Sequence, residues 1–575
     1  MRRLIRNIAS NEPTLLIFLG LVLGVITGYG AVGCRAGINA IREFAFGSGG
    51  DITDLARQAS PWLVLLLPAI GGIFVAPMVF RWASEARGHG VPEVMEAIAR
   101  RGARIRPRVS LVKAVASVIT IGTGGSVGWE GPIIQIGSGL GSTAGQLIRA
   151  ARRHMRILVA CGAAAGIAAT FNAPIAGVLF ALEVFMGDLA LVTFTPVVVA
   201  SVAATSVAFY HFGPHAILSV PRHIYKLQSV GEIPLYALLG IVCAVGAVLF
   251  TRLLYLFEDV FEGIRIPDLM KPVVGGLAVG ALGVALPDVL GVGYGTIAKT
   301  VEGNYPLVFL AGLFLAKLAA SCLTLGSGGS GGIFAPSLVL GAVVGAGFGH
   351  LAHMVFPSAI GLSGAYAVVG MAALTAGTTH APFAAILILF EMTDDYAIIL
   401  PLMIACVISS TVARGILHES IYTLKLARRG IRMRGGRDST VLQSLHVKEA
   451  MHTKPEMIAQ GEPFREVRRR LLTSRHHVFP VTSDRGVLVG VIDLDTVRPF
   501  LIEAGLEGIA VARDLAIDCE WVLSPEQDLQ TAREQFHRAP FDELPVVDPN
   551  SGRVVGILRE HELHAAYNRA VARLE

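Results

Sequence analysis

Residues 124–132 read GGSVGWEGP, and residues 328–336 read GGSGGIFAP. Each stretch follows a lysine, Lys113 or Lys317, with ten residues between, and a glycine stands at the same distance beyond each proline. Farther along the chain, identical internal spacings relate Gly162, Pro174 and Glu183 to Gly370, Pro382 and Glu391. Chance does not reproduce so many spacings, so the sequence predicts two homologous halves.

These two stretches have the chemistry of an anion site. Their glycines allow close approach of a ligand to the backbone, and Pro132 and Pro336 suit the first turn of a helix. The residues ahead of each proline would present unpaired N–H groups at the positive end of a helix dipole, which favours an anion over a cation. A third stretch, GHGVP at 88–92, follows the same pattern.

The composition excludes a purely soluble protein. Of the 575 residues, 53% are hydrophobic and 16% are charged, whereas soluble proteins carry about 25% charged residues. Between Asn304 and Phe390 the only formally charged residue is Lys317. The basic residues form short clusters beside apolar segments, which is typical of the cytoplasmic flanks of membrane helices and gives no indication of nucleic-acid binding.

The apolar segments predict an all-α polytopic membrane domain over residues 1–430, with an inverted repeat whose halves cover 14–230 and 231–430. Glycines and prolines interrupt many of these segments, so we expect broken, re-entrant helices. The segments are 14–32, 60–81, 109–150, 157–186, 190–210, 233–255, 271–292, 306–325, 333–355, 364–392 and 396–416. A linker at 431–440 leads to a charged α/β domain at 441–575, in which a strand–turn–strand pattern occurs twice.

Glu130 is the one charged side chain within these glycine-rich loops. Its carboxylate would compete for the N–H groups that an anion needs, and it would free them when it is protonated or swings away. The alternative is a helix-capping acid that only satisfies backbone N–H groups. Because an intramembrane acid is functional by default, we predict a proton-linked gate. Lys113 and Lys317 either raise the local potential or extend to the membrane surface.

Four motifs closely resemble the CLC family of chloride channels and chloride/proton exchangers: GHGVP (88–92), GWEGP (128–132), GGIFAP (331–336) and IYTL (421–424). The tail resembles a tandem pair of CBS motifs. The resemblance implies that Glu130 is the gating glutamate, that the backbone N–H groups of Ile333 and Phe334 bind the anion, and that the Tyr422 hydroxyl closes its inner side. The expected anion-binding set is His89, Gly90, Val91, Gly131, Ile333, Phe334 and Tyr422.

The chain departs from the family pattern at three positions. His89 replaces the usual serine, which puts halide preference in doubt, although an imidazole N–H can also donate to an anion. Val184 stands where many exchangers carry an inner proton-transfer glutamate. Glu183 is the remaining proton-transfer candidate, but one residue along a helix turns it by about 100°. Trp129 replaces the usual arginine beside the gate.

The tail lacks the Gly-x-x-Thr/Ser-x-x-Asp pattern of adenosine-binding CBS pairs. The corresponding positions read Gly490-x-x-Asp493-x-x-Thr496 and Gly556-x-x-Arg559-x-x-Glu562. A regulatory or dimer-stabilising module is therefore favoured over an adenine-nucleotide sensor.

Two other functions fit less well. A CBS-regulated cation transporter, for example of magnesium, needs several pore carboxylates, and the membrane segments supply few. Both glycine-rich stretches contain G-x-S-x-G, but a hydrolase elbow follows a strand and needs Asp and His partners in a set order. The apolar runs before these serines have helical length, so we predict no enzyme.

The sequence therefore predicts a gated anion transporter, with chloride as the favoured anion and either channel or exchanger activity. No cofactor or metal site is expected apart from a bound chloride ion. From the resemblance we expect a homodimer in which each chain has its own pathway. The expected location is a bacterial inner membrane, with the CBS tail in the cytoplasm.

Overall fold

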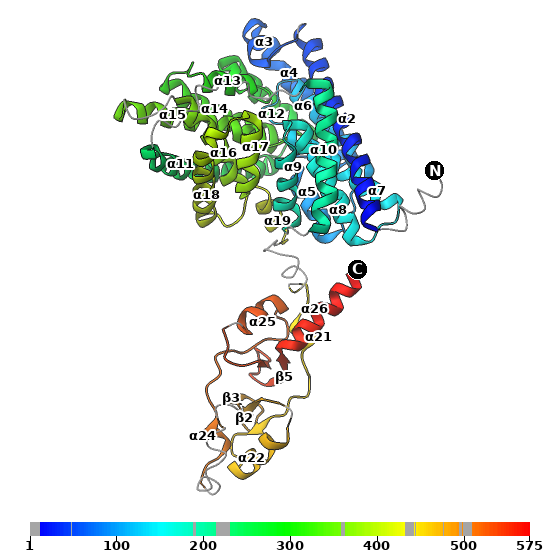
Figure 1. Ribbon diagram of the computed structural model, residues 1–575, viewed down its shortest axis with the longest axis vertical. Helices are drawn as coiled ribbons and strands as arrows, with labels where there is room; N and C mark the ends of the chain where they lie inside the picture. Colours follow the sequence, from blue (N-terminus) through cyan, green and yellow to red (C-terminus); the bar gives the residue numbers. More distant parts are fainter. Residues whose placement is uncertain are drawn as a thin grey trace. The chain divides into compact units, whose positions relative to one another are not determined.

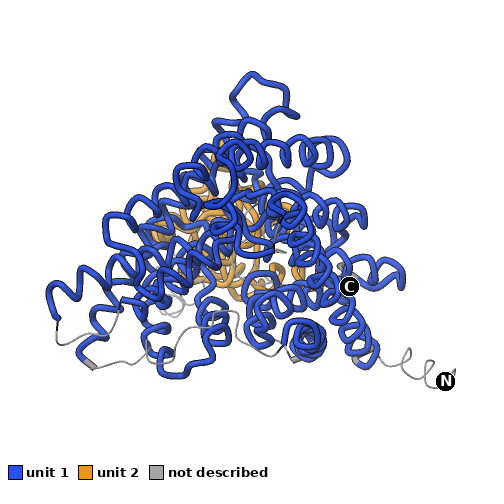
Figure 2. The backbone as a smooth tube through the Cα atoms, turned by 90° about the horizontal axis from the view of Figure 1, so that it is seen from above, with its two compact units in different colours: residues 1–433 blue, residues 434–575 orange. Residues whose placement is uncertain are grey.

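The computed structural model describes residues 12–47, 49–187, 191–213, 230–357, 363–431, 442, 444–474, 476–493, 497, 509–536 and 538–574. It divides into two units, residues 1–433 and 434–575, which Figure 2 colours separately. Nearly all of the predicted linker at 431–440 lies outside the described residues, as does Thr496.

The first unit is helical throughout its described part (Figure 1). Its first half contains α2 (Glu12–Phe46), α3 (Ile52–Gln58), α4 (Pro61–Pro77), η1 (Met78–Trp82), η2 (Ser84–Ala86), α5 (Val91–Arg100), α6 (Pro107–Gly122), α7 (Glu130–Leu147), α8 (Arg152–Phe171), α9 (Pro174–Phe180), η3 (Ala181–Met186) and α10 (Leu191–Phe212). Its second half contains η5 (Val230–Glu232), α11 (Ile233–Gly263), η6 (Asp268–Met270), α12 (Lys271–Ala285), η7 (Pro287–Val289), α13 (Tyr294–Val301), α14 (Leu307–Gly326), α15 (Phe334–Val355), α16 (Ser363–Thr379), α17 (Pro382–Thr393), η8 (Tyr396–Ile398), α18 (Ile399–Ile416) and α19 (Thr423–Arg428).

Within the described residues, nine of these helices are long and apolar enough to cross a membrane. They include α2 and α10, which pack side by side (Figure 1). Large apolar side chains such as Trp62, Phe74 and Leu315 point outward, which is the arrangement expected of a surface that faces lipid rather than water. The predicted polytopic membrane domain is confirmed.

Three of the predicted apolar segments each fold as two helices. Segment 109–150 forms α6 and α7, 157–186 forms α8 and α9 with η3, and 364–392 forms α16 and α17. The last two breaks occur where Asn172 and His380 adopt positive φ angles of 54° and 57°. A proline follows two residues later in both cases, and it starts the next helix because its fixed φ suits the first turn. The expected broken helices are therefore present.

The two halves exchange equivalent contacts. Glu183 accepts hydrogen bonds from the backbone N–H groups of Phe383 and Ala384 at the start of α17, at 3.4 and 2.8 Å. In return, Glu391 accepts from the N–H groups that start α9, those of Ile175 and Ala176, at 3.0 and 2.7 Å. The two contacts are equivalent under the predicted repeat, and such reciprocal pairs are expected when a two-fold axis relates the halves.

Glycines bring paired helices together in both halves. A Cβ atom on Gly162 of α8 would overlap the carbonyl oxygen of Gly137 on α7. The equivalent pair in the second half, Gly341 of α15 and Gly370 of α16, has the same close approach. Small residues at such crossings allow helices in a membrane to pack backbone against backbone.

The second unit has the predicted α/β pattern. Its elements are α21 (Val447–Ala450), β1 (Ile458–Ala459), α22 (Phe464–Thr473), β2 (Val478–Thr482), β3 (Leu488–Asp493), α24 (Ala512–Leu515), α25 (Leu529–Phe536), β4 (Glu543–Val547), β5 (Val554–Arg559) and α26 (Glu560–Leu574). Strands β2 and β3 form an antiparallel hairpin, with β1 parallel to β2, and β4 and β5 form a second antiparallel hairpin. The hairpin turns hold Gly486 and Gly552 at positive φ. Each turn donates a hydrogen bond to the other, from Leu488 N to Gly552 O and from Val554 N to Gly486 O.

The glycine crossing gives a first prediction. We expect Gly162→Ala to destabilise the membrane unit by about 1–3 kcal/mol, because the added methyl group has backbone in its way. Gly312→Ala on α14 is the matched control, since an added Cβ has nothing within 4 Å there. Thermal unfolding in detergent should show a lower midpoint for Gly162→Ala alone. Equal midpoints for the two variants would contradict the close crossing.

Candidate functional site

Three backbone segments far apart in the sequence meet inside the membrane unit. Gly88 donates from its N–H to Gly329 O at 3.2 Å, and Gly331 N–H donates to Gly88 O at 3.3 Å. Gly128 and Gly332 exchange both of their N–H···O bonds, at 2.9 and 2.6 Å. The loops at 88–92, 124–132 and 328–336 are thereby tied to one another, as the anion-site prediction requires.

Three helices begin at this junction. Helix α5 starts at Val91 after Gly90, whose φ is 83°. Helices α7 and α15 start at Glu130 and Phe334, so Pro132 and Pro336 both lie in a first turn as predicted. The unpaired N–H groups of helix starts carry partial positive charge. This junction of helix starts, called the cradle below, has the kind of donors that a small anion needs.

Two buried lysines donate hydrogen bonds to backbone carbonyl groups of loops at the junction. Lys113 Nζ donates to Ala86 O at 3.1 Å and to Gly88 O at 2.6 Å. Lys317 Nζ donates to Val289 O and Gly291 O, both at 3.0 Å. Both lysines are completely buried, so the alternative in which they extend to the membrane surface is wrong.

The lysine contacts identify a loop that the sequence analysis missed. Residues 291–295 read GVGYG, and Lys317 holds this loop as Lys113 holds GHGVP. Gly291 and Gly293 have positive φ angles, as do Gly88 and Gly90. The repeated Gly-x-Gly was a usable signal, but it is displaced by one residue relative to its lysine, and the alignment of spacings did not detect it.

The Glu130 carboxyl group lies within the cradle. The side chain is completely buried, and its Oε1 accepts a hydrogen bond of 2.8 Å from the Tyr294 hydroxyl. The backbone N–H groups of Glu130 itself, Ala335 and Trp129 lie beside the carboxyl group, while Oε2 makes no hydrogen bond of standard geometry within the described residues. A carboxyl group thus occupies the start of α15, where we expect an anion to bind.

His89 lies deeper in the same junction and is 3% exposed. Its Nε2 is 3.5 Å from the Tyr255 hydroxyl, which donates to Ile421 O at 2.6 Å. Among the residues that the structure describes, Nδ1 of His89 has no hydrogen-bond partner. The imidazole ring lies 5.9 Å from the Tyr422 ring, centroid to centroid.

Aromatic side chains join the remaining predicted residues. Phe180 lies 6.4 Å from Phe334 and 6.5 Å from Tyr422 between ring centroids, and Phe171 lies 5.3 Å from Phe334. Phe171 and Phe180 carried no signal in the sequence, because an aromatic residue in an apolar segment is usually part of the core. The structure brings together the predicted residues His89, Gly90, Val91, Glu130, Gly131, Ile333, Phe334 and Tyr422.

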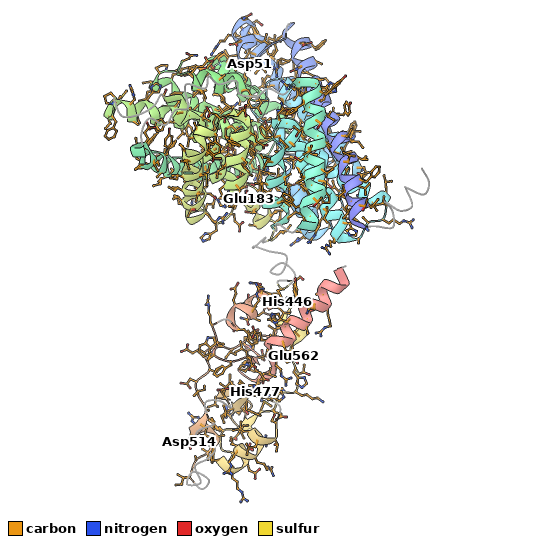
Figure 3. The ribbon with its side chains drawn as sticks, viewed as in Figure 1. Asp51, Glu183, His446, His477, Asp514 and Glu562 are labelled. Atoms are coloured by element: carbon orange, nitrogen blue, oxygen red, sulfur yellow. The ribbon has the colours of Figure 1, made fainter. Side chains whose placement is uncertain are left out.

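Glu183 lies apart from the cradle. Figure 3 labels it toward the opposite end of the first unit from Asp51, whereas the loop at 291–295 lies against the Asp51 side chain. Its carboxylate accepts the two N–H groups at the start of α17, so it caps that helix. Its role as a proton-transfer residue stays a prediction.

The two serines of the G-x-S-x-G stretches follow helices α6 and α14 rather than strands. The Ser126 hydroxyl pairs with that of Ser321 at 3.2 Å, and the Ser330 hydroxyl pairs with that of Ser117 at 2.9 Å. A nucleophile elbow needs a strand before the serine. These hydroxyl groups instead join the two halves.

Helix α19 connects the junction to the end of the membrane unit. It begins directly after Tyr422, and at its other end Arg429 pairs with Glu93 and Glu96 of α5 at 3.0 and 2.6 Å. Lys425 lies 3.7 Å from Glu93. The two helices that bring Tyr422 and His89 to the cradle are therefore also joined by ion pairs.

Comparisons with known proteins agree with this geometry. Residues 71–414 match the model of the voltage-gated chloride channel family, and residues 447–503 and 512–569 match the CBS domain. A ClcB-like chloride channel protein of Ralstonia nicotianae is 34% identical over 71% of this chain and 96% of its own length. An H(+)/Cl(−) exchange transporter, ClcA of Yersinia pseudotuberculosis, is 31% identical over 78% of this chain and 96% of its own length.

Solved structures give the same result. A slow cyanobacterial Cl−/H+ antiporter, 27% identical, matches 72% of this chain and 97% of its own with a TM-score of 0.64. A eukaryotic CLC transporter, 22% identical, shares the fold over 96% of this chain and 99% of its own, with a TM-score of 0.63. The named relatives are channels and transporters, not enzymes.

The capping role of Glu183 gives a second prediction. Glu183→Ala removes the acceptor from two N–H groups and should cost about 1–2 kcal/mol of stability. Glu183→Gln keeps one acceptor oxygen, so its thermal unfolding midpoint should stay near that of the unchanged protein. By the two-fold relation, Glu391→Ala should behave like Glu183→Ala. If Glu183→Ala left the midpoint unchanged, the capping assignment would be wrong.

Proposed function

We propose that Glu130 gates the transport pathway of this protein. The premise is that the chain belongs to the voltage-gated chloride channel (CLC) family and carries chloride through a CLC pathway. The observation that carries the proposal is the buried Glu130 carboxyl group at the start of α15, beside the Ala335 N–H. The cation-transporter alternative has no support, because the cradle presents N–H donors and the relatives named above are chloride proteins.

The gate works by competition for the same donors. The ionised carboxylate takes the place of an anion at the helix start, where the local field favours one negative charge. Protonation removes that charge and weakens the hold of the N–H groups, because hydrogen bonds to an ionised acceptor are the stronger ones. The neutral side chain then leaves the cradle, and chloride takes its position.

We assign the anion contacts to the groups that meet at the junction. The backbone N–H groups at the starts of α5, α7 and α15 surround the ion, and the Tyr422 hydroxyl closes the inner side. The proposed anion-binding residues are His89, Gly90, Val91, Gly131, Ile333, Phe334 and Tyr422. A bound chloride ion is the expected occupant, and no other cofactor is proposed.

His89 gives this pathway its own selectivity. The Tyr255 hydroxyl hydrogen is committed to Ile421 O, so the Tyr255 oxygen can only accept from His89 Nε2. We infer from this network that the neutral ring carries its proton on Nε2, so that Nδ1 is an acceptor. Nδ1 donates to an anion only after it has taken a proton, so we propose that anion binding here is sensitive to His89.

The wider setting follows the family. We propose a homodimer in which each chain has its own pathway, in a bacterial plasma membrane with the tail in the cytoplasm. The basic clusters at 2–6, 100–108, 149–156 and 428–437 support this orientation, since positive loops stay on the cytoplasmic side. We propose no enzymatic activity.

For the CBS pair we propose a regulatory or dimer-stabilising role rather than adenine-nucleotide sensing. Arg559 stands where nucleotide-binding pairs carry a hydroxyl residue, and it is engaged within the protein. Its guanidinium group contacts His476 at 2.8 Å and Glu543 at 3.1 Å.

The gating proposal predicts that Glu130→Ala and Glu130→Gln retain chloride flux but lose its dependence on pH and voltage. The measurement is chloride efflux from liposomes over a range of pH. Unaltered flux with unaltered pH dependence in Glu130→Ala would refute the gate.

A second measurement distinguishes the two transport modes of the family in the unchanged protein. It is the reversal potential under opposed chloride and proton gradients. A potential that follows chloride alone identifies a channel, and one that shifts with pH identifies an exchanger.

The selectivity proposal predicts that His89→Ser changes the order of anion preference, because a hydroxyl donates to an anion without first taking a proton. The measurement is the permeability series for halides and nitrate in liposomes. Tyr396→Phe is the matched control, since Tyr396 is an exposed side chain away from the junction. An unchanged series in His89→Ser would contradict the assignment.

A further inference from the structure

The Tyr294 hydroxyl is the one side-chain group within the described residues that donates a standard hydrogen bond to the Glu130 carboxyl group, at 2.8 Å. The two residues are 164 positions apart and come from opposite halves of the repeat. Glu130 is completely buried and Tyr294 is partly exposed. The phenol of one half thus contacts the buried carboxyl group of the other.

The backbone around Tyr294 is held firmly. Lys317 donates to two carbonyl groups of the preceding turn. Gly293 has a φ of 93°, and a Cβ atom there would lie 2.7 Å from the Val339 side chain. Ile297 N–H donates to Gly293 O at 3.0 Å and starts helix α13. A hydroxyl on so constrained a loop has little freedom to leave its partner.

Trp129 lies beside the same hydroxyl. Its side chain lies near the Tyr294 oxygen, and an indole N–H can only donate. Trp129 is therefore a neighbour that favours the Tyr294 oxygen as an acceptor, while the Tyr294 hydrogen is directed at Glu130. This gives Trp129, which stands where the family usually has arginine, a specific neighbour.

We propose that Tyr294 is a positioning residue that latches the ionised Glu130 side chain in its closed position. The inference rests on the proposed gating role of Glu130. A hydroxyl binds an ionised carboxylate more strongly than a neutral one, so the latch is tight while the gate is charged and loosens when a proton arrives. Release of the gate is thereby made dependent on protonation.

The other charged and titratable groups around this contact come from five elements or loops. Tyr422 at the start of α19 is near Glu130, and Arg35 of α2 is near Tyr294. Lys317 of α14 lies against Gly293, and Asp51 lies against Gly295. The His89 ring neighbours that of Tyr422. Tyr294→Phe keeps all of these side chains, so a change in pH profile that depends on Glu130 reports on the latch.

The test is Tyr294→Phe, with chloride efflux from liposomes measured as a function of pH. Flux rises as pH falls, because protonation opens the gate. Loss of the latch makes the closed, ionised state less stable, so half-maximal flux should move to higher pH by about one unit, with about tenfold more flux near neutral pH. Trp129→Phe should move the midpoint in the same direction by less, and it serves as the second variant should Tyr294→Phe fail to fold.

Tyr366→Phe is the matched control, because it removes a buried tyrosine hydroxyl that has no hydrogen-bond partner in the described part of the chain. Its pH profile should equal that of the unchanged protein. In a Glu130→Ala background, Tyr294→Phe should change nothing.

The outcomes separate the latch from the gate. A normal pH profile in well-folded Tyr294→Phe, with Glu130→Ala still pH-independent, overturns the latch and leaves the gate intact. A normal pH profile in Glu130→Ala overturns the gate itself. An equal shift from Tyr294→Phe with and without the Glu130 carboxylate also overturns the latch, because the hydroxyl would then act elsewhere.

Discussion

Helix starts buried in a membrane leave N–H groups that need a negatively charged or hydrogen-bonding partner, and this requirement organises the protein. Lipid offers no water to satisfy them, so each buried start must find an acceptor within the fold. At α9 and α17 the acceptors are Glu391 and Glu183 from the opposite half. At α15 the carboxyl group of Glu130 lies beside the Ala335 N–H. The same physical need is thus met by fixed caps at two helices, and at the third by the carboxyl group that we propose as the gate.

The repeat explains how one scaffold supplies both a fixed frame and a gate. Lys113 and Lys317 hold equivalent loops, and Gly128 and Gly332 bond to each other across the junction. The side chains at equivalent positions differ, however. Glu130 stands at the same distance from Lys113 as Phe334 does from Lys317. One half therefore provides the carboxyl group of the proposed gate, and the other provides the aromatic wall and the N–H groups beside it.

The buried lysines show how packing can override a pattern. Along the sequence each is a lone cation in an apolar run, which commonly extends to the lipid–water boundary. In the fold both are completely buried and are bound to backbone carbonyl groups. A buried ammonium group is costly unless its hydrogen bonds are satisfied. Each lysine therefore fixes a backbone loop through hydrogen bonds to its carbonyl groups.

The sequence by itself determined the membrane class, the two halves, the presence of broken helices and the helix starts at Pro132 and Pro336, and it singled out Glu130 as the candidate gate. Composition, spacing and turn chemistry are local properties that can be read along the chain. Tertiary structure alone decided that Glu183 and Glu391 exchange caps, that Phe180 joins Phe334 to Tyr422, and that the Tyr294 hydroxyl meets Glu130. Partners so far apart in sequence are chosen by how the helices pack, and no spacing along one chain encodes a contact that only the crossing of the two halves creates.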